Sequence, residues 1–490
     1  GSIDSRIVQN GADTTFSTGY LNMCIKSSGQ GAYYDLVDGS FTANNINLGS
    51  GGASSNAVFT QSGGTATVNT QINIGKYAGT TGSSIYNLDG GSLTIKKDLA
   101  GNPFAFTANN DSYFDFDGGT LNLKGDWDVL DLINYADSDF RAFGGNSLVD
   151  FGLLQFSSVD IETEAYTAIQ AVADPIQTWN GVEANWNTAN WTPSVGVDEL
   201  PVADQAMVVD SGTVTLDAAA SDFSAASLQI ALDSPDGTVE IASPRMLSLK
   251  AASIGDGGVL NVAGTLDTVI GVEIASGAEM TVTGSLDAPI LKIAGTLNLT
   301  GGTETLGVIN LTDGALTTDH ALAATSLTAT GGSLNLNGND LTVDDLSLNN
   351  SLDMGAGVLT ANNSITLNNA TLTIANDVTT GTLNIVNSEI VDAAVGGPFT
   401  VAATDQYSFE NITYGRDVVD GGPGAAKLEV GVTTASDHHL VKLTGANNTY
   451  SGETVIRWKS TLEVSPDAAN LGSGLLRFWG GSQDNETVLQ

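Results

Sequence analysis

The sequence contains one cysteine, Cys24, and three histidines, which excludes several kinds of site from the start. A single thiol can form neither an internal disulfide bond nor a thiolate metal cluster, and a small buried thiol is the expected role of Cys24. No apolar run approaches 18 residues, so no membrane-spanning helix is expected. The chain opens with Gly1-Ser2, typical of an expression remnant, so we expect the export signal and any anchor to lie outside it.

Positive charge is also scarce. The chain has 16 Lys and Arg against 55 Asp and Glu, a formal net charge of −39, and Lys292 is the only Lys or Arg between residues 251 and 415. Nucleic acid and anionic membrane surfaces are therefore not expected partners, because binding phosphates requires Lys and Arg. Hydrophobic residues make up 41% of the chain and are patterned, which excludes disorder. This acidic composition is typical of a secreted or surface protein.

A pattern of strand, glycine turn and strand occurs four times near the N-terminus; YNLDGGSLTI at 86–95 is one copy. The last glycine of each turn and an aromatic residue five positions earlier recur at intervals of 25, 27 and 28 residues: Gly39, Gly64, Gly91 and Gly119, with Tyr34, Phe59, Tyr86 and Phe114. A phosphate-binding loop would occur once and open a helix. The repetition therefore indicates that Gly90-Gly91 is a structural corner between strands.

A shorter repeat begins near residue 205. Five of its leucines are separated by 19, 18, 18 and 20 residues: Leu297, Leu316, Leu334, Leu352 and Leu372. Apolar residues at alternate positions predict short strands whose inward side chains stack into columns. Both repeats predict an all-β chain folded as a right-handed parallel β-helix, with roughly 20 coils if most of the chain is coiled. β-Sandwich domains are the alternative, but they need no constant turn period.

Composition divides the chain into four predicted segments. These are a β-solenoid with ~27-residue repeats, a Trp- and Pro-rich boundary or cap, a β-solenoid with ~19-residue repeats and a distinct C-terminal region: 1–170, 171–204, 205–410 and 411–490. The chain is thus expected to hold two solenoid segments joined at the boundary. Residues 126–145 are less regular and are expected to hold a short helix or a cap.

Two stretches resemble known secreted proteins. Residues 178–216, with Trp-Asn-Gly, two Asn-Trp pairs and a Pro-x-x-Asp-x-Ala-x-Val run, resemble the opening of β-solenoid modules in surface proteins of environmental bacteria. The stretch LTGANNTYSGETVIRWKSTLEV, 443–464, resembles the autotransporter-associated β-strand repeat, with Ser460 where that repeat normally has Gly; 470–481 resembles the strand pair that follows. The resemblance implies an exported bacterial β-helix used as a passenger, stalk or adhesin, without a shared catalytic site.

No catalytic set is recognisable. None of the three histidines has a catalytic sequence context, and His438-His439 is expected to be an exposed pair. Asp344-Asp345 resembles the carboxylate pair of a polysaccharide-cleaving site, but neighbours on a strand point to opposite faces unless a bulge intervenes. The preferred interpretation is that the acidic residues are turn and surface carboxylates.

The basic residues that a pectin-cleaving site requires are missing near this pair. Arg457-Trp458-Lys459 resembles the Arg-x-Lys element of such sites only weakly and lies far from Asp344-Asp345 in the sequence. No cofactor and no metal site are expected. Weak structural calcium binding by the acidic, glycine-rich stretches 109–119 and 417–424 is the alternative, although neither fits a known calcium loop.

Three tryptophans in the boundary segment are the candidate ligand-binding residues: Trp179, Trp186 and Trp191. Their rings could stack on sugars, or they could form a small core that closes the start of a solenoid, which we prefer because prolines flank them. The predicted function is a non-catalytic extracellular or cell-surface scaffold, stalk or adhesin, with polysaccharide or other surface components as partners. A polysaccharide lyase or glycoside hydrolase, or a carbohydrate-binding module, is the alternative.

Overall fold

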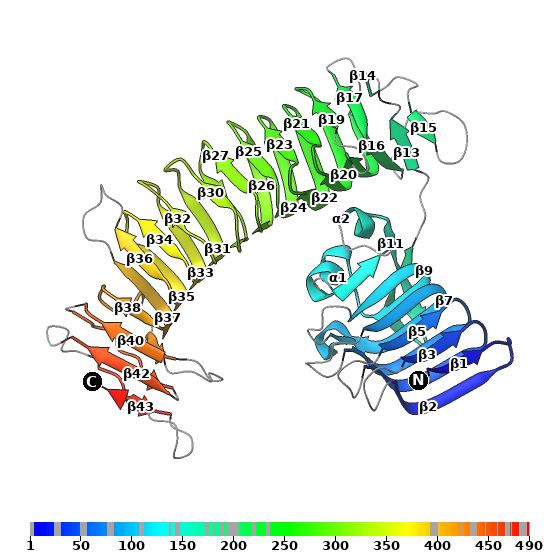
Figure 1. Ribbon diagram of the computed structural model, residues 1–490, viewed down its shortest axis with the longest axis horizontal. Helices are drawn as coiled ribbons and strands as arrows, with labels where there is room; N and C mark the ends of the chain where they lie inside the picture. Colours follow the sequence, from blue (N-terminus) through cyan, green and yellow to red (C-terminus); the bar gives the residue numbers. More distant parts are fainter. Residues whose placement is uncertain are drawn as a thin grey trace. The chain divides into compact units, whose positions relative to one another are not determined.

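The computed structural model shows a protein that is nearly all β, with 67% strand and 4% helix (Figure 1). Its strands stack in parallel coils, about 17 turns in all, so the prediction of a parallel β-solenoid is confirmed. The structure describes the following residues: 4–23, 31–49, 56–75, 83–106, 112–136, 139–142, 148–171, 176–179, 181, 183–186, 191–193, 205–217, 222–231, 236–392, 400–422, 425–431, 439–445, 447–457, 459–465, 471, 473–479 and 488–489.

The chain divides into two compact units. Unit 1 comprises Gly1–Pro175 with Asp204–Ala206, and unit 2 comprises Ile176–Ala203 with Met207–Gln490.

Unit 1 is built on one sheet of twelve strands. The strands are β1 Ser5–Gln9, β2 Thr15–Asn22, β3 Gly31–Leu36, β4 Ser40–Leu48, β5 Asn56–Gln61, β6 Thr65–Ile74, β7 Ser84–Asp98, β8 Phe104–Phe106, β9 Ser112–Lys124, β10 Phe140–Ala142, β11 Leu154–Ile161 and β12 Glu164–Ala171. Three short helices lie among them: η1 Leu99–Gly101, α1 Val129–Ala136 and α2 Leu148–Gly152. Helix α1 lies within the irregular stretch 126–145, as expected. The antiparallel pair β11 and β12 covers the edge of β9.

The aromatic repeat of unit 1 forms a stacked column in the core. Tyr34, Phe59, Tyr86 and Phe114 are register partners on successive strands, with ring centroids 4.9, 4.6 and 5.2 Å apart. All four side chains are buried. Buried glutamines accept hydrogen bonds from the phenols: Tyr34 donates to Gln9 at 2.7 Å and Tyr86 donates to Gln61 at 2.9 Å.

The predicted glycine corners are confirmed, with one difference. Gly39, Gly64, Gly91 and Gly119 all have positive φ, between 62° and 87°. A strand ends at the corner in the first two copies, whereas β7 and β9 continue through Gly91 and Gly119. The register between β7 and β9 shifts between Asp89 and Ser92, so the corner in the third copy is a bulge within one long strand.

Unit 2 contains one long sheet and three shorter ones. The 17-stranded sheet comprises β13 Ile176–Trp179, β15 Trp191–Pro193, β16 Ala206–Val209, β18 Phe223–Ile230, β20 Met246–Ile254, β22 Thr265–Ile274, β24 Ser285–Ile293, β26 Thr303–Leu311, β28 Leu322–Ala323, β29 Ser326–Ala329, β31 Leu341–Leu348, β33 Leu359–Asn368, β35 Val378–Val386, β37 Val401–Glu410, β39 Lys427–Val430, β41 Thr454–Ile456 and β43 Leu476–Phe478.

The second face of unit 2 is divided among three sheets. The first comprises β14 Ala184–Asn185, β17 Ser211–Leu216, β19 Asp236–Ile241, β21 Val259–Val262, β23 Glu279–Val282, β25 Thr296–Leu299, β27 Ala315–Thr318 and β30 Ser333–Asn335. The second comprises β32 Leu352–Asp353, β34 Thr371–Ile374 and β36 Glu389–Asp392. The third comprises β38 Ile412–Tyr414, β40 His439–Leu443, β42 Ser460–Val464 and β44 Val488–Leu489.

The leucine spacing of unit 2 corresponds to register columns. Leu297 pairs with Leu316 and Leu316 with Leu334, and Leu352 pairs with Leu372 on the next sheet. These leucines belong to one continuous cluster of buried residues that runs from Trp179 to Leu462. A period of 18–20 residues thus returns the chain to the same inward position on each coil, which buries one apolar column against the next.

Candidate functional site

A cleft in unit 2 lies where the second face changes from the sheet that ends at β36 to the sheet that begins at β38. Strands β35 and β37 are hydrogen-bonded neighbours in the long sheet, but β36 and β38 belong to different sheets. The two strands start close together, since the Asn387 amide donates to the Glu410 carbonyl at 3.1 Å. Beyond this bond no ladder joins the described parts of β36 and β38, and the strands separate around a cleft of about 720 Å³.

The register of the flanking strands shows which backbone groups face this cleft. Glu389 pairs with Thr371 of β34, and its amide donates to the Ala370 carbonyl. Because bonding direction alternates along a strand, the backbone groups of Ile390 point away from β34 and toward β38. On the other wall, the Tyr414 carbonyl accepts a hydrogen bond from the backbone N–H of Thr444, the residue that follows β40. The backbone groups of the preceding residue, Thr413, therefore point the other way, toward β36.

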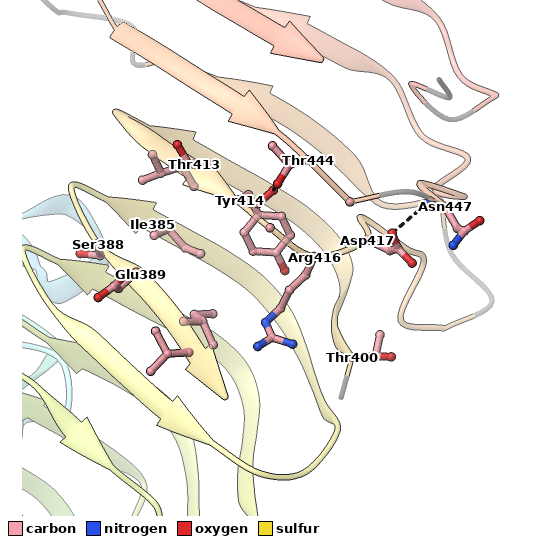
Figure 2. A pocket seen from close by; sticks show the side chains of 15 residues that line it. Ile385, Ser388, Glu389, Thr400, Thr413, Tyr414, Arg416, Asp417, Thr444 and Asn447 are labelled. Carbon is pink, nitrogen blue, oxygen red and sulfur yellow. Dashed lines mark hydrogen bonds between the residues drawn. The ribbon is translucent and has the colours of Figure 1, made fainter. Parts of the chain in front are cut away.

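The side chains of the cleft are mostly polar (Figure 2). Arg416 extends from the end of β38 toward β36, and the carboxylates come from Glu389 on β36 and Asp417 after β38. The Asp417 carboxylate accepts a hydrogen bond of 2.7 Å from the backbone N–H of Asn447. The remaining lining residues are Ile385, Ser388, Ile390, Val391, Thr400, Ile412, Thr413, Tyr414, Gly415, Thr444, Gly445 and Asn447.

Tyr414 forms part of the buried wall of the cleft. Its ring packs on Phe409 with centroids 4.6 Å apart, and its phenol donates to the Val401 carbonyl at 3.4 Å. Burial raises the pKa of Tyr414 well above its usual range, so the phenol is neutral at physiological pH. With Tyr414 neutral, three charged side chains line the cleft: the guanidinium of Arg416 and the carboxylates of Glu389 and Asp417.

The three tryptophans predicted as a ligand site come together inside unit 2. Trp179 and Trp191 are register partners on the antiparallel strands β13 and β15, and Trp191 also packs edge-on against Trp186. The Trp191 indole donates to the Trp186 carbonyl at 3.1 Å. Each tryptophan is only 2% exposed and belongs to the solenoid core. Sugar binding by these residues stays a prediction, and the burial of their rings weighs against it.

The Asp344-Asp345 pair lies at a bulge. The register between β31 and β33 shifts between Val343 and Asp345, and both carboxylates are half-buried. Asn362 on β33 donates to Asp344 at 2.8 Å, and Ser364 donates to Asp345 at 2.5 Å. The two carboxylates are thus bonded to neighbouring side chains of the next coil.

The histidine pair does not match the expectation of an exposed pair. His438 lies outside the described residues, but His439 is 5% exposed, and its Nδ1 lies 2.9 Å from Glu410 Oε1. His439 opens β40 and pairs in register with Ser460 of β42, which holds its side chain inside the coil. The prediction of exposure was therefore wrong for His439, because strand pairing and not local polarity determines its orientation.

The basic residues near the C-terminus have structural partners. Arg457 lies 2.6 Å from Glu429 and stacks over the Trp479 ring at 4.3 Å, while Trp458 is outside the described residues. Lys459 has a φ of +54°, so in this turn the left-handed conformation falls on Lys459, directly before Ser460.

Cys24, the single cysteine, lies outside the described residues.

Neither a metal site nor a membrane helix is found in the part of the chain that the structure describes. No group of three or more His, Cys, Asp or Glu residues there is arranged to hold a metal ion. Part of each proposed calcium segment lies outside that part: residues 109–111 and 423–424. The helices of the described ranges are too short or too polar to cross a membrane.

Sequence reasoning missed the cleft. Its only local signal is Arg416, a basic residue just beyond a long stretch almost without Lys or Arg. The alternating pattern adds little: β38 alternates apolar and polar residues, whereas β36 has the adjacent apolar residues Ile390 and Val391 where β34 alternates. No protein-family model, curated protein or solved structure matches the chain.

Proposed function

We propose that the protein is a non-catalytic extracellular or cell-surface scaffold that acts as a stalk or adhesin. The observation that carries this proposal is the 17-stranded sheet of unit 2, which runs without a break over one continuous core. With neighbouring strands about 4.8 Å apart, the strands from β16 to β43 extend for about 60 Å along the stack. Such a stack suits a spacer, because each coil is supported by its neighbours on both sides.

The resemblance at 443–464 supports an exported bacterial protein. Strands β41 and β42 lie in this stretch, which begins at the last residue of β40, and they continue the same stack, as the autotransporter-associated repeat would require. The proposed partners are polysaccharides or other surface components, since the net charge of −39 disfavours nucleic acid and anionic lipid.

Surface exposure can be tested directly. Intact cells of the source organism would be treated with a protease that cannot enter them, and the protein followed with an antibody raised against this chain. We expect its band to disappear while a cytosolic marker remains. A band that persists on intact cells and disappears only after lysis would contradict a surface location.

A polysaccharide-active enzyme is the second candidate, favoured by the presence of two carboxylates and an arginine in one cleft. Glycoside cleavage uses a carboxylate pair, and the other carboxylate cluster considered, Asp344-Asp345, is bonded to its neighbours. Release of new reducing ends from polysaccharides, lost in Glu389→Gln and Asp417→Asn, would establish this activity. We expect no release.

A further inference from the structure

We infer that the cleft between β36 and β38 binds a neutral, hydroxyl-rich saccharide chain. This inference deepens the proposed surface role and rests on it for its biological meaning. The binding itself belongs to the isolated protein, so it can succeed or fail whatever the outcome of the protease experiment on cells.

The shape of the cleft suits a small polar ligand. Its volume of about 720 Å³ lies within the usual range for ligand sites, roughly 300–1,000 Å³. Each wall is held by a ladder on its far side, β36 by β34 and β38 by β40, and the β35–β37 ladder joins the two coils on the opposite face. Backbone groups of Ile390 and Thr413 face the cleft from opposite walls and offer fixed donors and acceptors.

The side chains offer the mixture that a polyhydroxyl ligand requires. Every sugar hydroxyl both donates and accepts a hydrogen bond, so its site needs donors and acceptors close together. Arg416 supplies donors only and the carboxylates of Glu389 and Asp417 supply acceptors, while the hydroxyls of Thr413 and Thr444 supply both. The half-buried Ile390 can pack against the C–H face of a sugar ring, while Ile385 and Ile412 belong to the buried core behind it.

The negative charge of the cleft and of the whole chain favours a neutral saccharide over an anionic one. The two carboxylates outnumber the single guanidinium in the cleft, and the whole chain carries −39. A uronate or phosphate would therefore enter against the field of the protein, although Arg416 alone would favour it. A free cation could bind to the carboxylates, but the positive charge of Arg416 would repel it, and the hydroxyls of Thr413 and Thr444 would have no ligand group to bind.

The experiment measures retardation of the full chain in native gels that contain soluble polysaccharides. The probes are dextran, mannan, xylan, soluble starch and hydroxyethylcellulose, with polygalacturonate as the anionic probe. We expect at least one neutral polysaccharide to retard the protein, and titration calorimetry with its oligosaccharide to give the affinity. Because the ligand is neutral, the affinity should be nearly the same in about 20 mM and about 500 mM salt, although the Debye length falls about fivefold between them.

Three variants connect the binding to the cleft. Arg416→Gln should weaken it at least about tenfold, the loss expected for one hydrogen bond to a charged group. Thr413→Trp, at an exposed position on β38, should block the cleft without entering the core. Arg245→Gln, a half-buried arginine of unit 2 that pairs with Asp222, is the matched control and should bind normally.

Three results would overturn the inference. The first is retardation by none of the neutral polysaccharides. The second is binding that Arg416→Gln and Thr413→Trp leave unchanged, which would place the site elsewhere. The third is binding of polygalacturonate alone, weakened by salt, because the cleft would then select a charged ligand.

Discussion

The imidazole Nε2 of His320 lies 2.7 Å from Glu304 Oε2, and its Nδ1 lies 2.8 Å from Asp319 Oδ1. The backbone amide of Gly301 also donates to Asp319, at 2.9 Å. Both imidazole nitrogens thus face carboxylates, which favours the doubly protonated, charged ring. This cluster joins two successive coils at the edge of the solenoid.

The stability of unit 2 should depend on pH through this cluster. The hydrogen bond to Asp319, followed by that to Glu304, raises the pKa of His320 above its ordinary 6.5. The stabilising contribution is therefore fully present below pH 6.5 and is lost as the pH rises through the raised value. The loss in melting temperature caused by His320→Gln should be greater at about pH 5.5, below the ordinary pKa, than at about pH 8.5, where less of the ring is charged. An equal loss at both values would show that the ring contributes through packing alone.

The aromatic column should contribute strongly to the stability of unit 1. Phe59 is fully buried between Tyr34 and Tyr86, so Phe59→Ala should lower the free energy of unfolding by about 3–5 kcal/mol. Phe16, which is 39% exposed on the first coil, is the matched control, and Phe16→Ala should cost about 1 kcal/mol. Urea denaturation followed by circular dichroism measures both. Similar costs would contradict the role of the stacked column.

The Gly91 corner should tolerate no side chain. Its φ is +71°, and a Cβ there would lie 2.3 Å from the Gly64 carbonyl oxygen of the preceding coil. Gly301 has nearly the same φ, +70°, but no atom within 4 Å of a Cβ. Gly301→Ala should therefore cost about 1–2 kcal/mol from backbone strain, and Gly91→Ala more than about 3 kcal/mol. Thermal unfolding compares them; equal costs would mean that neighbouring coils do not touch at the corner.

The Arg457–Glu429 pair should act as a coupled unit. Burial raises the pKa of Glu429, but hydrogen bonds from Arg457 and Lys427 outweigh this effect and lower it. Arg457→Met would leave the buried carboxylate with Lys427 at 2.9 Å as its ion-pair partner and a 3.5 Å hydrogen bond from Gln406, and should cost about 3 kcal/mol. Adding Glu429→Gln should recover part of this loss, as a double-mutant cycle would show. Strictly additive losses would contradict the coupling.

The solenoid itself could be predicted because its coils are local repeats. Turn glycines, alternate apolar residues and a near-constant period each follow from how one coil must return to the same position, so the register of Tyr34, Phe59 and Tyr86 follows from their spacing. The orientation of His439 could not be predicted in this way. Its polar neighbours in the sequence suggested exposure, whereas its pairing with Ser460 on the next coil buries it.

The amino-acid sequence by itself determined the strand pattern, the positive-φ corners and the apolar columns, because these depend on residues a fixed distance apart. Only the tertiary structure decided where the ladder between coils breaks. Strand β38 keeps the alternating pattern and β36 departs from it only at Ile390-Val391, yet the two strands separate while β35 and β37 remain bonded. Pairing between two coils depends on the path of the chain that connects them. Arg416, Glu389 and Asp417 therefore line one cleft only in the folded protein.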